Sequence, residues 1–265
     1  MQTIIAAGGT YTSTDKPGKL NEYIMSHVSP GESFFGISSG NDTIFHTNQT
    51  MAMLFVSVII LILFGVIYKK NQKVPTGITN FLETFVMFVR NDIAIANMGQ
   101  EDGRKWAPLF CTFFFFVLGC NLLGLVPGAT TATGNINVTA ALACITFFAM
   151  TVGAIVTKGF GTWFSAFVPH GVPVPVLLLI TPLELLGLVV KTIALMIRLF
   201  ANMMAGHIVL FAMIGLVYVI GNIAIIASPI SLAVYGLELF VAFLQAYIFT
   251  YLSAMFLGSV LHPDH

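Results

Sequence analysis

The chain has 265 residues, of which 57% are hydrophobic and only 8% are charged. A soluble domain carries about 25% charged residues, so this chain lacks the polar side chains needed to cover a water-exposed surface. Its mean hydropathy of +0.92 also excludes intrinsic disorder. Because the formal net charge is +0, we expect no nucleic-acid partner. The composition therefore predicts an integral membrane protein.

A polar segment, residues 1–48, precedes the first apolar run. Its first nine residues lack the basic region that begins a signal peptide, so we expect no cleaved signal. The run 51–68 is free of charge and just long enough for a membrane span. Six of the eleven basic residues lie between positions 69 and 105, which places this stretch inside and the N-terminal segment outside.

An amphipathic helix is predicted over about 76–98, within the basic stretch. Apolar side chains recur there at helical spacing, from Ile78 through Phe81 and Phe85 to Val89. A helix with one apolar face is typical of the membrane interface. Packing in a soluble layer gives the same pattern and is the alternative.

The rest of the chain divides into further spans. Residues 106–157 carry no charge but are interrupted by turn residues at 127–135, and Lys158 ends this part on the inside. A Gly- and Pro-rich connector over 159–175 leads to two long apolar helices that meet at Gly221-Asn222. We predict an all-α membrane domain, 49–265, with about five transmembrane helices, the last two forming a long hairpin and the C-terminus inside. The predicted spans are 51–68, 106–125, 137–157, 176–220 and 223–261.

Three charged residues recur every seven positions along the fourth span: Glu184, Lys191 and Arg198. Seven residues are nearly two helical turns, so the three share one face. An arginine at the centre of a span costs about 2.5–3.5 kcal/mol on insertion scales and is a candidate functional residue by default. Lys191 can instead snorkel to the inner headgroups, and Glu184 can be a solvated helix end. No acid of this chain is expected at the depth of Arg198, which favours an anionic partner on another subunit over a structural ion pair.

Folding the last two helices back at Gly221-Asn222 places Arg198 level with Gln245 and His207 level with Glu238. His207 lies about 180° around its helix from Arg198, so we expect the two to serve different faces. A histidine and a carboxylate are usual members of a proton relay. A hydrogen-bonded structural pair is the alternative for His207 and Glu238.

Four segments resemble, in the same order, segments of subunit a of F-type ATP synthases. The most specific is Leu195–His207, which reads LMIRLFANMMAGH. The others are Asn121–Gly128 (NLLGLVPG), Asn135–Thr139 (NINVT) and Leu244–Phe249 (LQAYIF). The resemblance implies a stator subunit that conducts protons past a rotating ring of c subunits, with its last two helices long and tilted along the ring. It also implies two offset half-channels that load and unload ring carboxylates.

The resemblance assigns a role to each polar residue of the hairpin. Arg198 matches the family's essential arginine, which faces a ring carboxylate and separates the half-channels. Glu184 matches the acid of the inner half-channel, and His207 and Glu238 match the outer one. Some bacterial relatives carry these last two residue types in exchanged positions. Asn202 and Gln245 match polar neighbours of the arginine.

The implied partners are the c-subunit ring, peripheral-stalk b-type subunits, the other ATP synthase subunits and membrane lipids. The implied location is the bacterial plasma membrane, with the mitochondrial inner membrane as the alternative. We expect no ATP chemistry on this chain, because it contains no phosphate-binding loop, and we expect no cofactor and no metal ion. A secondary transporter or ion channel with Arg198 as an anion site is the competing function. That alternative predicts internal repeats, which the sequence lacks.

Overall fold

The computed structural model describes residues 4–6, 9–11, 47–67, 77–126, 132–165, 167, 174–220 and 224–262. Beyond a small β-hairpin near the N-terminus, every regular element in these ranges is helical. The elements are β1 (Ile4–Ala6), β2 (Gly9–Tyr11), α2 (Thr47–Ile62), the π-helical η1 (Leu63–Ile67), α3 (Ile78–Phe88), η2 (Val89–Ile95), α4 (Ala96–Gly124), α5 (Ile136–Phe148), η3 (Ala149–Gly153), α6 (Ala154–Lys158), α7 (Phe160–Ser165), α8 (Val174–Ile220) and α9 (Ala224–Leu261).

The prediction of an all-α membrane protein is confirmed. Four helical stretches of the described chain are long and apolar enough to cross a membrane, and α2 adds a shorter apolar stretch, Gln49–Gly65. The four stretches are Ile78–Gly124, Ile136–Lys158, Val176–Val209 and Leu232–Leu261. The sequence did not predict β1 and β2, which pair antiparallel with Ile4 opposite Tyr11. Most of the polar segment 1–48, and the expected turn at Gly221-Asn222, lie outside the described residues.

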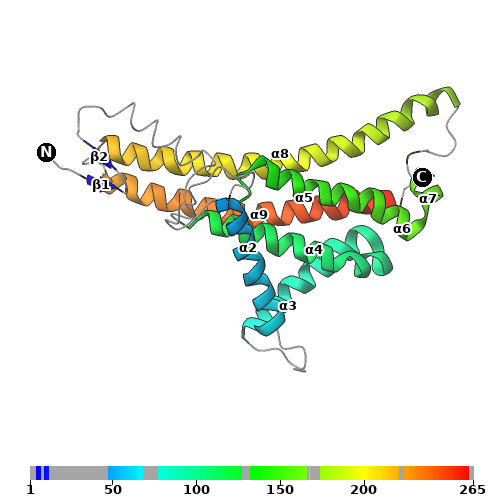
Figure 1. The fold of residues 1–265 in the computed structure, drawn as a ribbon, viewed down its shortest axis with the longest axis horizontal. Coiled ribbons are helices and arrows are strands. Elements are labelled where there is room, and N and C mark those ends of the chain that lie inside the picture. Colours follow the sequence, from blue (N-terminus) through cyan, green and yellow to red (C-terminus); the bar gives the residue numbers. More distant parts are fainter. Residues whose placement is uncertain are drawn as a thin grey trace.

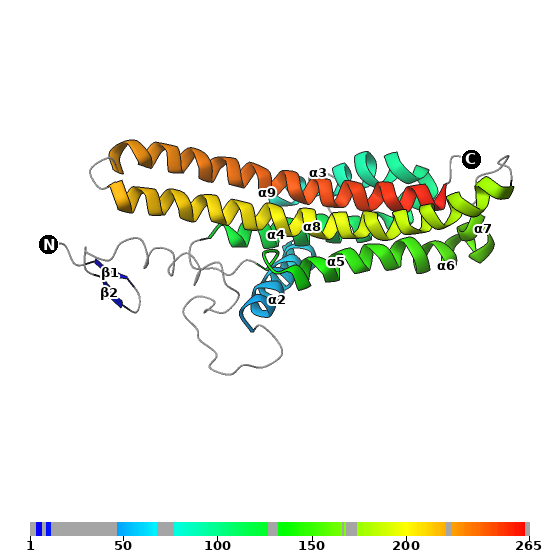
Figure 2. The ribbon, with the colours of Figure 1, turned by 90° about the horizontal axis from the view of Figure 1, so that it is seen from above.

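The long helices α8 and α9 run antiparallel along the longest axis of the molecule (Figures 1 and 2). Helix α4 packs against α9, and α5 packs against α8. Helix α2 crosses α4 obliquely, and Gly119 of α4 lies directly under the side chain of Val56 at the crossing. Lipid tails are as apolar as these side chains, so close packing rather than exclusion of water holds such helices together.

A sharp reversal of the chain at Gly99 separates the amphipathic helix from the second span. Gly99 has φ 75° and ψ 177°, which breaks the helix, and a left-handed φ of this kind favours glycine. Beyond the reversal, a Cβ on Gly103 would lie 2.7 Å from Cα of Ile95, so η2 and α4 meet backbone to backbone. The two helices on either side of Gly99 therefore form a tight hairpin.

The predicted connector 159–175 is partly helical. Helix α7 lies within it, and its aromatic side chains pack on one another: Trp163 contacts Phe167 edge to face at 5.0 Å, and Phe160 stacks on Phe164 at 6.5 Å between ring centroids. Aromatic contacts of this kind contribute about 0.5–1.5 kcal/mol each. The Gly and Pro content of the segment did not indicate this helix or its aromatic packing.

Candidate functional site

A close contact between α8 and α9 joins Gly206 to Glu238. A Cβ on Gly206 would lie 2.6 Å from Oε1 of Glu238, so only glycine leaves room for the carboxylate. This contact sets the two residues at the same depth in the antiparallel pair. The expected register, with His207 level with Glu238, therefore agrees with the structure to within one residue.

Two polar side chains of α9 lie in the hairpin with unsatisfied polar atoms. Both carboxylate oxygens of Glu238 are buried, and the described residues offer them no hydrogen-bond partner. The side chain of Gln245, two turns along, is buried, and its Nε2 also lacks a partner among the described residues. A buried polar group without a partner costs about 1–3 kcal/mol. These atoms therefore need a partner beyond the described residues.

Arg198 lies on the exposed surface of α8. Its side chain is exposed, whereas Leu195 and Leu199 beside it are buried. No acidic side chain of the described chain forms an ion pair with the Arg198 guanidinium. Asn202, one turn further along, is half-buried. The structure therefore presents the guanidinium outward, in the middle of a long apolar helix.

Glu184 and Lys191 share the α8 face with Arg198 but differ in surroundings. Glu184 is exposed, and about 21 Å of helix separates it from Arg198. The ammonium of Lys191 lies 5.7 Å from the ring centroid of Phe256 on α9, a cation–π contact. The structure thus turns Lys191 toward α9 and leaves Glu184 and Arg198 on the surface. Glu184 lies far from the Gly206–Glu238 contact, so the predicted residues form separate groups and not a single cluster.

The surface around Arg198 is apolar and open. In the most apolar 18-residue segment of α8, only 11% of the segment is buried inside this chain, and in α9 the share is 22%. The corresponding share for the α3–α4 stretch is 50%. Large side chains on both helices are more than half exposed, among them Val190 and Leu186 of α8 and Leu237 and Phe240 of α9. A face of this size needs lipid or another apolar protein surface to cover it.

A polar network that the sequence did not single out links α4 to α9. Asn121, fully buried in α4, donates from Nδ2 to the Ala242 carbonyl at 3.4 Å and accepts from the Thr133 hydroxyl at 2.9 Å. Tyr235 donates to the Leu125 carbonyl at 3.2 Å. Both links hold the part of α9 that carries Glu238. In the sequence, Asn121 is marked only as a polar residue in an apolar run. That pattern does not show which residues its side chain contacts.

An ion cluster that the sequence also missed joins three elements where α6 and α9 end (Figure 1). The Asp102 carboxylate, 5% exposed, lies 2.9 Å from Nζ of Lys158 and 3.0 Å from Nε2 of His262. Lys105, one turn along α4, lies 3.6 Å away. The burial of the Asp102 carboxylate is offset by the ammonium groups of Lys158 and Lys105 and by the hydrogen bond with His262. Among the described residues, no group of three or more His, Cys, Asp or Glu side chains could hold a metal ion.

Comparison with known proteins gives one consistent result. The family described as ATP synthase A chain matches residues 50–258. The ATP synthase subunit a of Anaeromyxobacter sp. (strain Fw109-5) is 45% identical over 225 residues, covering 83% of this chain and 55% of the relative. That of Chloroherpeton thalassium is 43% identical over 267 residues, covering 94% of this chain and 79% of the relative. The chain spans less than two thirds of the length of the Anaeromyxobacter relatives that it matches.

Proposed function

Because the chain belongs to the ATP synthase A chain family, we propose that it is the stator subunit that conducts protons through the membrane sector of an F-type ATP synthase. Its apolar helices and its bacterial relatives identify it as an integral membrane protein. We place it in the bacterial plasma membrane, with the N-terminus outside and the C-terminus inside. Its partners are the c-subunit ring, the b-type stalk subunits and the other subunits of the complex.

One observation carries the proposal: Arg198 presents an exposed guanidinium from the middle of α8, and no acid of the described chain pairs with it. An unpaired cation in a bilayer is costly, so its partner comes from outside this chain. A carboxylate on a rotating ring supplies that partner. The exposed apolar face of α8 and α9 gives the ring a surface to move along.

The outer half-channel ends at Glu238 and His207. The buried oxygens of Glu238 have no hydrogen-bond partner among the described residues, and water that fills a path to this point satisfies them and delivers protons from outside. A proton passed from this pair neutralises a ring carboxylate. The neutral carboxyl group then enters the lipid at low cost, because the charged form pays for desolvation and the neutral form does not.

The inner half-channel opens near Glu184. After almost a full turn of the ring, the carboxyl group returns to Arg198, which stabilises its ionised form and so favours release of the proton toward Glu184. Asn202 and Gln245 supply polar groups beside the arginine. The fixed charge of Arg198 also repels a proton that would pass directly between the half-channels, so each proton must travel with the ring.

Each proton that crosses yields about 2.3 kcal/mol per 100 mV of membrane potential, and this drives rotation. Arginine suits the gate because it stays protonated in an apolar environment, whereas a buried lysine readily loses its charge. The chemistry of ATP takes place on other subunits, and this chain needs no cofactor or metal for its part.

The test is Arg198→Ala in the assembled complex, with Ile197→Ala as the matched control. Ile197 is the adjacent residue, is also exposed, and carries no charge. The complex is reconstituted into vesicles for two measurements: ATP-driven proton pumping, and passive proton flux with and without a carboxyl-modifying reagent. We expect Arg198→Ala to abolish pumping, with any residual flux blocked by the reagent, and Ile197→Ala to pump. Pumping by Arg198→Ala at the wild-type rate would overturn the proposal and favour a transporter.

A further inference from the structure

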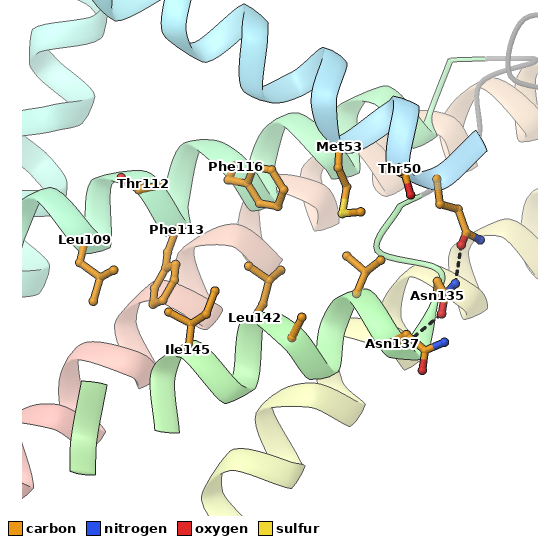
Figure 3. Close-up of a pocket in the computed structure, with 13 residues that line it drawn as sticks. Thr50, Met53, Leu109, Thr112, Phe113, Phe116, Asn135, Asn137, Leu142 and Ile145 are labelled. Atoms are coloured by element: carbon orange, nitrogen blue, oxygen red, sulfur yellow. Dashed lines mark hydrogen bonds between the residues drawn. The ribbon is translucent and has the colours of Figure 1, made fainter. Parts of the chain in front are cut away.

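A groove of about 550 Å³ lies between α2, α4 and α5, away from the polar residues of the hairpin (Figure 3). Its lining is most polar at one end, where α2 and α5 begin. Thr50, Asn135 and Asn137 lie there, and Gln49 accepts a hydrogen bond from Asn135. The far end, at Leu109 and Ile145, is apolar. None of the described residues that line this α2–α4–α5 groove carries a charge.

The length of the groove matches one leaflet of a bilayer. Asn135 and Ile145 are ten residues apart, so the groove extends about 15 Å along α5. This is half of a hydrocarbon core about 30 Å thick. Beyond Ile145 the helices close, because the ring of Trp106 in α4 occupies the position that a Cβ on Gly153 would take. Along α5, the groove therefore has a polar mouth at Asn135 and Asn137 and an apolar end at Ile145.

These dimensions favour an occupant thinner and shorter than a transmembrane helix. A helix about 10 Å wide and 30 Å long occupies about 2,400 Å³ and crosses both leaflets. The groove has a volume of about 550 Å³ and extends about 15 Å along α5. It is also open sideways, since Thr112, Ala141 and Ile145 on its walls are exposed. An occupant can therefore enter from the bilayer.

We propose that the α2–α4–α5 groove binds one acyl chain of a glycerophospholipid from the leaflet at which α5 begins. The acyl chain fills the space along Phe113, Phe116 and Leu142. Without it, these side chains would lack van der Waals contacts on the side that faces the groove. The ester region of the lipid lies at the mouth, within reach of the exposed Asn137 amide. Because the lining is uncharged, the groove selects the acyl chain and not the charge of the headgroup.

Hydrogen bonds of Asn135 hold the polar end of the groove in a fixed geometry. Asn135 donates from Nδ2 to Oε1 of Gln49, which ties the start of α5 to the start of α2. Its Oδ1 accepts from the backbone N–H of Asn137 at 2.9 Å and caps α5. These bonds fix the separation of the two helices before any lipid arrives, so binding does not need the groove to be formed anew.

The test uses the whole ATP synthase complex in nanodiscs of phosphatidylcholine and phosphatidylglycerol. Each lipid in turn carries a photoactivatable diazirine in its acyl chain, and labelled peptides are mapped by mass spectrometry. We expect both lipids to label 109–116 and 138–145 at least about tenfold more than Val156, which is exposed on α6 outside the groove. Labelling that is no stronger than at Val156, or by phosphatidylglycerol alone, would overturn the proposal.

Two matched variants separate binding in the groove from contact with bulk lipid. Ala141→Phe places a ring in the groove, whereas Cys144→Phe adds the same ring to an exposed residue one turn along α5 that does not line it. We expect Ala141→Phe to reduce labelling at least about tenfold and Cys144→Phe to leave it unchanged. Equal labelling in both variants contradicts the proposal. A second probe replaces Met53 with a photoreactive methionine analogue. If this analogue crosslinks to a stalk-subunit peptide and to no lipid, the proposal is also contradicted.

Discussion

Gly206 of α8 and Glu238 of α9 are in direct contact, with Oε1 of the carboxylate 2.6 Å from where a Cβ of Gly206 would lie. Glycine inside a helix costs about 0.5–1 kcal/mol relative to alanine. Its presence at this point is explained by the carboxylate, which takes the space of the missing side chain. The contact therefore fixes both the register of the hairpin and the position of the one acidic group buried within it.

Gly206→Ala should impair proton pumping without unfolding the protein. The new methyl group meets the flexible end of the Glu238 side chain, which can rotate away, so we expect thermal stability close to that of the wild type. The carboxylate moves by an ångström or more, and displacements of this size reduce rates by up to about a hundredfold. ATP-driven pumping in reconstituted vesicles measures the loss.

Gly187→Ala is the matched control for this change. Gly187 also lies in α8, and nothing lies within 4 Å of its Cβ position. The substitution gives the same gain in helix propensity with no contact, so pumping should remain at the wild-type level. A similar loss in both variants would show that the effect comes from the helix and not from Glu238.

Exchanging His207 and Glu238 tests whether the two act as a pair. If they share one water-filled cavity, the double variant His207→Glu with Glu238→His keeps one histidine and one carboxylate there. We expect it to pump faster than either single variant, with a coupling free energy of about 0.5–3 kcal/mol in a double-mutant cycle. Additive losses would mean that the two residues work independently.

Sequence reasoning predicted the helices well because hydropathy is a strong signal in a membrane protein. The predicted fifth span, 223–261, differs from α9 by one residue at its start, and the hairpin register by one residue at Glu238. Both predictions needed only helix geometry and the position of one turn. Arg198 is exposed on α8, and the expectation that its partner lies outside this chain stays a prediction.

The contacts between distant segments could not be predicted in the same way. Asp102 reads as one of several charges in a polar stretch, and its partner His262 is 160 residues away. Asn121 and Ala242 are 121 residues apart, and one of the two groups is a backbone carbonyl, which no sequence pattern marks. Apolar helices have many similar faces, so hydropathy shows that they pack but not which residues meet.

Asp102→Asn should destabilise the end of the bundle where α6 and α9 finish. It leaves the ammonium of Lys158 and the imidazole of His262, 32% and 50% exposed, beside a neutral amide. Removing one partner of a fully buried pair costs about 3–5 kcal/mol; partial exposure reduces this to about 1–3 kcal/mol. Thermal unfolding of the purified complex can be monitored by the reaction of the Cys120 thiol, which is buried in the folded protein. The unfolding temperature of Asp102→Asn should be lower than that of the wild type.

Lys105→Ala provides the comparison for the Asp102 cluster. Lys105 is 63% exposed and lies 3.6 Å from the carboxylate. Surface pairs of this kind contribute about 0–1 kcal/mol, so the midpoint should change little. Equal shifts in Lys105→Ala and Asp102→Asn would mean that the carboxylate does not depend on Lys158 and His262.

Gly258→Ala should be the most disruptive glycine substitution in α9. A Cβ at Gly258 would overlap the backbone carbonyl of Asn97 and lie 3.3 Å from Cγ of Met98, next to the chain reversal at Gly99. Backbone cannot rotate away as the Glu238 side chain can, so α9 and the reversal must move apart. Overpacking of this kind costs about 1–3 kcal/mol. Gly236→Ala, also in α9 but with open space at its Cβ position, should leave the unfolding midpoint unchanged or raise it. If the two variants unfold at the same temperature, the reversal at Gly99 is looser than its contact with Gly258 implies.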